Sequence, residues 1–442
     1  MLPIIYILLS VVAIVLLITR LKLHPFLALL FVSIAFGLVS GMPFNDLIIS
    51  IQDGFGGTLG KIGLIIILGV IIGAFLEHSG GAMALAEKVL HLIGEKRVVT
   101  AMAIIGYIIS IPVFADSGFV LMSALNKSLT KKAGLSLAAT SIALAMGLIL
   151  THTLVPPTPG PLAAAGILEA DLGKVIFMGL VVAAIALVPA IVFAKKVAAK
   201  VYIDPEIEEP VKQENNYSPG VIKSALPIFI PIALIILKSM SVFLIDSGWQ
   251  LNVKNVLSFI GEPVIALIIG FFFCLALPQK LEKSMLSADG WVGKALLDCT
   301  GIILITGAGG IFGKVLQNSE AGVLMGNSLS HLNIGIFLPF ILSAAFKSAQ
   351  GSSTVAMITT ASIMTPLMVV LGFTSEWDKV FVVLAIGAGS IVVSHANDSL
   401  FWVVTQMSGM NVKTGYRLHT MGTLIVGVAS MIALFILFLI FH

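Results

Sequence analysis

The sequence predicts an all-α polytopic membrane protein with two inverted repeats, each of five transmembrane helices, one of them broken, plus a re-entrant helical hairpin. Three observations lead to this prediction. The 442 residues are 58% hydrophobic and only 11% charged, against about 25% charged in an ordinary soluble domain. Apolar stretches of about 20 residues, enough to cross a bilayer, recur along the chain. Two of these stretches are interrupted by polar residues around His152 and His395.

The N-terminal repeat is predicted at residues 1–197. Its crossings are expected at 2–19, 25–41, 60–77, 133–170 and 174–194, and the fourth is the broken one. No basic region precedes the first apolar segment and no small-residue cleavage site follows it, so we expect a membrane span and not a removable signal peptide. The apolar segment 98–126 has basic residues at both ends, and its 29 residues are too short for two full crossings at about 1.5 Å per residue. It therefore predicts a hairpin with its tip near Asp116.

The C-terminal repeat is predicted at residues 221–442, after a solvated acidic linker at 198–220 on the cytoplasmic side. Its crossings are expected at 221–244, 255–277, 291–316, 379–411 and 418–441, and the break lies in the fourth. A second hairpin is predicted at 334–371, with its tip near Gln350.

The distribution of charge predicts how the two halves are oriented. Lys and Arg gather in loops on one side of this scheme and Asp and Glu in loops on the other, and basic loops favour the cytoplasm. Five crossings per half force the second copy to be inverted, with both termini outside. The halves also match weakly in sequence, because Ser117 falls opposite Ser352 and His152 opposite His395. Alternating access follows naturally from such symmetry.

Composition argues against several other classes of protein. A formal charge of +3 without a basic face does not favour a nucleic-acid partner. The two cysteines, Cys274 and Cys299, lie in apolar stretches, so a disulfide framework or a four-cysteine metal site is not expected. Neither a His-Glu-x-x-His nor a Gly-x-Ser-x-Gly motif is present, which weakens the interpretation of the chain as an intramembrane hydrolase. We expect no metal and no cofactor.

The hairpin tips carry the first set of candidate site residues. Asp116, followed by Ser117 and Gly118, is a carboxylate near mid-membrane, where insertion costs about 2.5–3.5 kcal/mol. It is interpreted either as a proton carrier or cation ligand, or as a cap of the following half-helix. Lys347 could supply charge to an anion or form a structural ion pair with Asp116 or Asp398. The second tip continues with Gln350, Gly351, Ser352, Ser353 and Thr354, and free amides at such a helix start favour an anionic substrate.

The two breaks carry the second set. Four prolines between Pro156 and Pro161 prevent a continuous helix, and a histidine beside the break can shuttle protons or simply bond a freed carbonyl. Amide, hydroxyl and carboxylate groups together suit a hydroxylated acid, or else a self-satisfied network that fixes the break. The predicted substrate-binding residues of tips and breaks are Ser117, Gly118, Thr151, Thr153, Lys347, Gln350, Gly351, Ser352, Ser353, Thr354, Asn397 and Ser399, and the predicted proton-coupling residues are Asp116, His152, His395 and Asp398.

At these same residues the chain resembles the gluconate permease family of proton symporters, within the wider ion-transporter superfamily. The most specific matches are Phe114-Ala115-Asp116-Ser117, Thr151-His152 followed by Pro156-Pro157-Thr158-Pro159-Gly160-Pro161, Ala349-Gln350-Gly351-Ser352 with Thr354-Val355-Ala356, and Ser394-His395-Ala396-Asn397-Asp398-Ser399. The resemblance implies proton-driven uptake of gluconate or a related sugar acid, and relatives in the superfamily suggest a homodimer with an elevator motion. Many members have His in place of Thr158 and Arg in place of Lys347, and only Arg forms a bidentate fork with a carboxylate.

The sequence thus predicts a multi-pass transporter of the inner membrane that imports gluconate or a related small hydroxy acid by proton symport. Its expected partners are the lipid bilayer, the small anion and a second copy of the chain. One alternative is a sodium-coupled carboxylate transporter of the same architecture, because hydroxyls and carbonyls at the hairpin tips can hold sodium. A less favoured alternative is a membrane-embedded enzyme that uses the His and Asp pairs.

Overall fold

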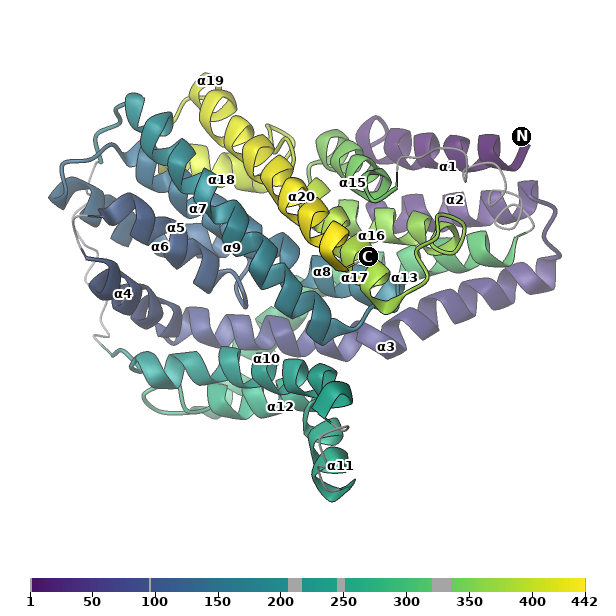
Figure 1. Ribbon diagram of the computed structural model, residues 1–442, viewed down its shortest axis with the longest axis horizontal. Helices are drawn as coiled ribbons and strands as arrows, with labels where there is room; N and C mark the ends of the chain where they lie inside the picture. The colour runs from purple at the N-terminus through teal and green to yellow at the C-terminus, as the bar shows by residue number, and fades with distance from the viewer. Residues whose placement is uncertain (1, 95–96, 206–216, 245–250, 320–334, 442) are drawn as a thin grey trace.

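The computed structural model describes residues 2–94, 97–205, 217–244, 251–319 and 335–441, and all of the regular structure in these ranges is helical (Figure 1). The first half contains α1 (Leu2–Thr19), α2 (Pro25–Val39), α3 (Phe44–His78), α4 (Gly81–Ile93), α5 (Val98–Ile109), α6 (Ala115–Lys132), α7 (Leu137–Leu154), α8 (Pro159–Ile167) and α9 (Leu172–Lys196). The second half contains α10 (Val221–Leu244), α11 (Leu251–Ile260), α12 (Pro263–Cys274), α13 (Trp291–Asn318), α15 (Phe337–Gln350), α16 (Ser353–Met364), α17 (Glu376–Gly389), α18 (Ser399–Met407), α19 (Val412–Gly415) and α20 (Met421–Phe441). Residues 206–216 of the predicted linker and residue 334 of the second hairpin lie outside the described ranges.

Six helical segments of the described chain are long and apolar enough to cross a membrane. They are Phe44–His78, Leu137–Ile167, Leu172–Lys200, Val221–Met240, Lys283–Asn318 and Val412–Phe441. These segments confirm the prediction of an all-helical, multi-pass membrane protein. The inverted relation of the two halves stays a prediction.

Several element boundaries differ from those expected. The predicted crossing 60–77 is the second half of α3, a 35-residue helix that begins at Phe44. Pro43 precedes it and Asp46 lies in its first turn, which suits the positive end of a helix dipole. The hairpin predicted to end at residue 126 continues as α6 to Lys132, because lysines are good helix formers and favour the last turn of a helix.

We assign the helices to two groups that also pack against each other, since α13 contacts α16 and α10 contacts α9. The frame group comprises α1, α2, α3, α4, α10, α12 and α13, with the most extensive contact between α3 and α13. The cavity group comprises α5–α9, α15–α18 and α20, in which α7 contacts α5 and α9, and α17 contacts α15 and α20. In Figure 1, α3 runs across most of the molecule, with α10 and α12 on one side and the cavity group on the other.

Glycines allow two of these helix pairs to approach closely. A Cβ added at Gly54 of α3 would lie 2.6 Å from the carbonyl oxygen of Gly310 in α13. A Cβ added at Gly147 of α7 would lie 2.1 Å from the carbonyl oxygen of Ala103 in α5. Without side chains at these positions the backbones pack directly against each other, as is common between membrane helices.

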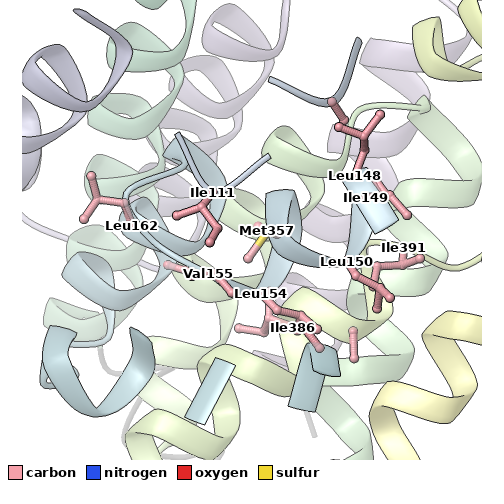
Figure 2. Packing of buried hydrophobic residues seen from close by; sticks show 14 of the residues in the cluster. Ile111, Leu148, Ile149, Leu150, Leu154, Val155, Leu162, Met357, Ile386 and Ile391 are labelled. Atoms are coloured by element: carbon pink, nitrogen blue, oxygen red, sulfur yellow. The ribbon is translucent and has the colours of Figure 1, made fainter. Parts of the chain in front are cut away.

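Two helices of the cavity group stop partway and resume after a short irregular segment. α7 ends at Leu154, and α8 begins with Pro159 at a position where its missing N–H costs nothing. α17 ends at Gly389, and α18 begins at Ser399 with Asp398 as its N-cap. Buried apolar side chains, among them Leu150, Leu154 and Ile386, pack around the end of α7 (Figure 2).

Candidate functional site

A cavity of about 340 Å³ lies where the two helix breaks meet the two hairpin tips, and its size is typical of a small-molecule site. All of its walls come from the cavity group. It is lined by Phe114, Ala115, Asp116, Ile149, His152, Gln350, Gly351, Ser352, Ser353, Thr354, Asn397, Asp398, Ser399 and Leu400. The structure therefore brings together polar residues from both halves of the chain, as the sequence predicted.

The tip of the second hairpin depends on a glycine. Gly351, between α15 and α16, has a φ of +89°, in the left-handed region that glycine favours. A Cβ added there would lie 2.0 Å from the carbonyl oxygen of Asn397. Ser352 is the N-cap of α16, because its Oγ accepts a hydrogen bond from the N–H of Val355. The close contact between Gly351 and Asn397 holds the start of α16 against the second helix break.

Asp398 lines the cavity and is the centre of a buried polar network. Lys347 Nζ donates to Asp398 Oδ2 at 2.6 Å and also to the carbonyl oxygen of Gly351. The Ser394 hydroxyl donates to the same Oδ2, and the Leu400 N–H donates to Oδ1 at 3.2 Å. The side chains of Lys347 and Asp398 are 1% and 7% exposed, so each charge depends on the other for compensation.

Asp116 lines the same cavity from the first turn of α6. Its Oδ2 accepts a hydrogen bond of 2.6 Å from the Ser399 hydroxyl at the start of α18. The N-cap of α6 is Phe114 and it makes no side-chain cap, so the alternative interpretation of Asp116 as the capping residue is wrong. Among the described residues no lysine or arginine forms an ion pair with Asp116.

Two side chains of the cavity lining carry buried polar atoms without a partner in the described part of the chain. They are the Gln350 amide, both of whose polar atoms are unpaired, and His152, whose Nδ1 is unpaired. A buried polar atom that makes no hydrogen bond costs about 1–3 kcal/mol. These atoms are not exposed to the cavity in this conformation, so a ligand or water would bond to them after a rotation of the side chains.

Six predicted site residues do not line the cavity. The hydroxyls of Thr151 and Thr153 turn back to carbonyl oxygens of their own helix, at Gly147 and Ile149. His395 Nε2 lies 2.9 Å from the Ser348 carbonyl oxygen. Lys347 does not reach the cavity lining, because its Nζ is bonded to Asp398 and to the Gly351 carbonyl oxygen. The other two are Ser117 and Gly118, which lie beyond Asp116 in α6.

The structure also adds residues that the sequence reasoning missed. His419 is fully buried on the short π-helix Tyr416–Thr420, a rare element that is frequent at functional sites. Its Nε2 lies 3.0 Å from Ser394 Oγ. Since the Ser394 proton is directed to Asp398, His419 Nε2 is the donor in that contact. Phe114, Ile149 and Leu400 supply the apolar part of the cavity lining, and no feature of their sequence positions marked them.

The cavity is lined by polar groups that can bind a small polar ligand. No group of three or more His, Cys, Asp or Glu side chains with metal-binding geometry occurs in the described ranges. The lining instead offers amides, hydroxyls and the start of a helix. A cavity of this kind between broken helices, inside a bundle of membrane-spanning segments, is typical of a membrane permease.

Comparison with known proteins identifies the family. Residues 2–440 match the model of the GntP family permease, and the chain belongs to this family. It is 33% identical to the gluconate permease of Pseudomonas aeruginosa, over 98% of this chain and 97% of that protein. It is 35% identical to the inner membrane permease YgbN of Escherichia coli K12, over 95% and 94% of the two chains, and 31% identical to the D-serine transporter DsdX of the same strain, over 97% of each.

Two solved structures share the fold. One is the YdaH transporter of Alcanivorax borkumensis, with a TM-score of 0.59 at 14% identity, over 87% of this chain and 86% of that one. The other is MtrF of Neisseria gonorrhoeae, with a TM-score of 0.62 at 13% identity, over 88% and 83% of the two chains. At this level of identity the likeness concerns the fold alone. The family and its relatives are permeases and not enzymes, so the alternative of a membrane-embedded enzyme is wrong.

Proposed function

We propose that the chain is a secondary active transporter of the inner membrane that imports gluconate or a related small hydroxy acid by proton symport and alternating access. The observation that carries this proposal is the cavity of about 340 Å³ with the unpaired Gln350 amide and His152 nitrogen in its wall. A ligand rich in hydroxyl groups would satisfy both, because each hydroxyl can donate and accept.

The carboxylate of the substrate would bind at the start of α16. Ser353 and Thr354 lie in the first turn of this helix and line the cavity, and the positive end of the helix dipole there favours an anion. Lys347 lies just behind this turn, bonded to Gly351 and Asp398. It would hold the turn between α15 and α16 in place through these bonds, while Asn397 and Gln350 take the hydroxyls of the substrate.

The coupled proton would reside on Asp116. Lys347 and Asp398 form an ion pair and cancel each other, which leaves Asp116 as a carboxylate in the cavity wall without a cationic partner in the described chain. A substrate carboxylate would place a second negative charge in the same cavity, where repulsion is little screened. Protonation of Asp116 removes that repulsion, so anion and proton would bind together. His152, His395 and Asp398 remain secondary candidates for this role.

A sodium-coupled carboxylate transporter is the alternative. Asp116 and the Ser399 hydroxyl lie 2.6 Å apart at the cavity, and two such oxygens with nearby carbonyls could hold Na⁺ in place of a proton. Replacing sodium by potassium during uptake separates the two modes of coupling, because proton symport is unaffected by this exchange.

The identity of the acid can be narrowed by chemistry. Related permeases are named for gluconate and for D-serine, and both molecules carry a carboxylate beside a hydroxylated carbon chain. A panel of gluconate, other aldonates, glycerate and D-serine would therefore test the class. The amide and helix-start donors of the cavity suit the carboxylate that both molecules share.

Uptake into proteoliposomes with an imposed pH gradient tests the proposal. The wild-type protein should accumulate labelled gluconate or a panel acid against its gradient, and Asp116→Asn should abolish accumulation while retaining exchange of internal for external substrate. Asp46→Asn is the matched control. Asp46 also lies in the first turn of a helix, but its side chain is exposed and does not line the cavity. Flux that is unsaturable and independent of the gradient would contradict the proposal.

An elevator motion of a homodimer is proposed as the means of alternating access. It is supported by the placement of the whole cavity within one group of helices, because a group that carries its complete site can move as a unit. Cross-links between the frame and cavity groups should trap the protein and stop uptake. A monomer active in reconstituted vesicles would refute the dimer.

A further inference from the structure

A second cavity, of about 500 Å³, lies between the frame group and the cavity group. Its walls come from α3 and α13 on one side and from the ends of α8, α16 and α17 on the other. Three lysines, Lys61, Lys314 and Lys379, line it together with Asp53 and Glu169. It shares no lining residue with the cavity at the helix breaks.

Glu169 occupies the cationic part of this second cavity. Its carboxylate forms an ion pair with Lys61 of α3. The hydrogen bond from Lys61 is the main cause that lowers the pKa of Glu169 below its ordinary value, and the charges of Lys61, Lys379 and Lys314 act in the same direction. A carboxylate is therefore already held at the point where the influence of three ammonium groups converges.

The backbone at Glu169 has an unusual conformation for this residue. Glu169 follows the end of α8 with a φ of +54°, and the Ala170 N–H bonds to the Ala165 carbonyl oxygen as in a Schellman cap. Glycine is the usual residue at this position because a side chain makes the left-handed region unfavourable by about 1 kcal/mol. Packing gives no reason for a Glu here, because its side chain is 63% exposed. The contact that distinguishes Glu169 at this position is the ion pair of its carboxylate with Lys61.

We propose that this second cavity is an entry site for the transported carboxylate, and that Glu169 fills it with the chain's own carboxylate when no substrate is present. The inference rests on the proposed function. An incoming hydroxy acid would bind Lys314 and Lys61 through its carboxylate and displace Glu169. Lysine suits such a transient site, because its single ammonium exchanges partners without the fixed geometry of a bidentate pair.

Displacement of Glu169 would also change the contact between the two helix groups. Lys61 belongs to α3 of the frame group, whereas Glu169 follows α8 of the cavity group. The other ion pairs recorded in the described ranges, Lys238 with Glu262, Lys347 with Asp398 and Lys379 with Glu376, each stay within one group. Arrival of the anion would thus release the ion pair that ties the cavity group to the frame.

Kinetics of uptake by the reconstituted full-length protein test the inference. Glu169→Gln frees Lys61, so the KM for gluconate should fall about two- to fivefold, as expected for one exposed charge pair. Lys314→Gln should raise the KM by a similar factor with an unchanged maximal rate. Both effects should disappear in about 1 M salt, where the Debye length is about 3 Å. Glu262→Gln is the matched control, because it breaks another exposed Lys–Glu pair outside the cavity.

The outcomes separate this inference from the proposed function. If Glu169→Gln and Lys314→Gln behave like Glu262→Gln while the wild-type protein transports, the entry site is refuted. A change in maximal rate with a constant KM also refutes it, because that result describes a purely structural ion pair. If the wild-type protein takes up none of the panel acids, the proposed function fails. Gluconate binding to the purified variants in low salt then tests the anion site. Glu169→Gln should lower the dissociation constant for gluconate, and Lys314→Gln should raise it.

Discussion

The buried pair of Lys347 and Asp398 allows a quantitative prediction about the second helix break. Lys347→Met leaves Asp398 with the donors Ser394 and Leu400 but without a counter-charge. Asp398→Asn leaves the Lys347 ammonium with neutral acceptors only, the Gly351 carbonyl and the new amide oxygen, and without a counter-charge. Removing one partner of a buried pair costs about 3–5 kcal/mol, and we expect the Asp398 variant at the upper end.

The double variant should be more stable than the sum of the two single changes predicts. Methionine and asparagine together leave no unpaired charge in this buried region, so we expect at least half of the single loss, about 2 kcal/mol, to be regained as coupling. Thermal or denaturant unfolding in detergent measures the stability of the wild-type protein, the two single variants and the double variant. Lys379→Met is the control, because its pair with Glu376 is exposed and close in sequence.

Additivity would refute this account. If the double variant loses the full sum of the single losses, the two side chains do not compensate each other and the ion pair does not organise the break. Uptake is a separate readout, because Asp398 lines the cavity whereas Lys347 does not. Lys347→Arg should restore stability but alter the KM for the acid, since the larger guanidinium must fit behind Gly351.

Three further predictions concern single positions. Gln350→Leu removes a buried amide without a recorded partner, so stability should hold or rise while the KM for the transported acid increases about tenfold; an unchanged KM would exclude the amide from binding. Gly351→Ala should abolish uptake because its Cβ would meet a carbonyl oxygen at 2.0 Å, whereas Gly372→Ala, also at positive φ but in open space, should be tolerated. Glu169→Cys should react with an impermeant thiol reagent from outside the cell and Lys280→Cys only after permeabilisation, because the native cysteines are buried; the reverse pattern would invert the topology.

The sequence was sufficient to locate the cavity because a membrane makes interruptions visible. Asp116, Gln350 and Asp398 interrupt apolar stretches that the sequence predicts as two hairpins and a broken crossing, where unpaired polar groups are costly. Residues of this kind either line a cavity or bond to one another. The structure shows both outcomes, since Gln350 faces the cavity without a partner while Asp398 is bonded to Lys347.

The same reasoning could not separate lining residues from their neighbours. Thr151 and Thr153 have the polarity expected of a binding site, but a threonine hydroxyl within a helix can bond the carbonyl four residues earlier, and both do so. His395 likewise lies against a carbonyl oxygen of the hairpin tip. Which polar groups are satisfied within the protein depends on side-chain direction, and residue type does not determine it.

His419 is the residue of the buried polar network that the sequence indicates least. It follows Lys413 and Arg417 in sequence, so it belongs by position to the basic flank of the last crossing, and nothing local distinguishes it from a surface histidine. The π-helix of residues Tyr416–Thr420 holds it in the protein interior against Ser394. Through that hydroxyl it extends the network of Asp398 by one group, from a segment 25 residues further along the chain. Polar residues at the cavity wall interrupt their own apolar segment and can be recognised there, whereas the residues that support them from behind come from other segments and are identified only by the packing.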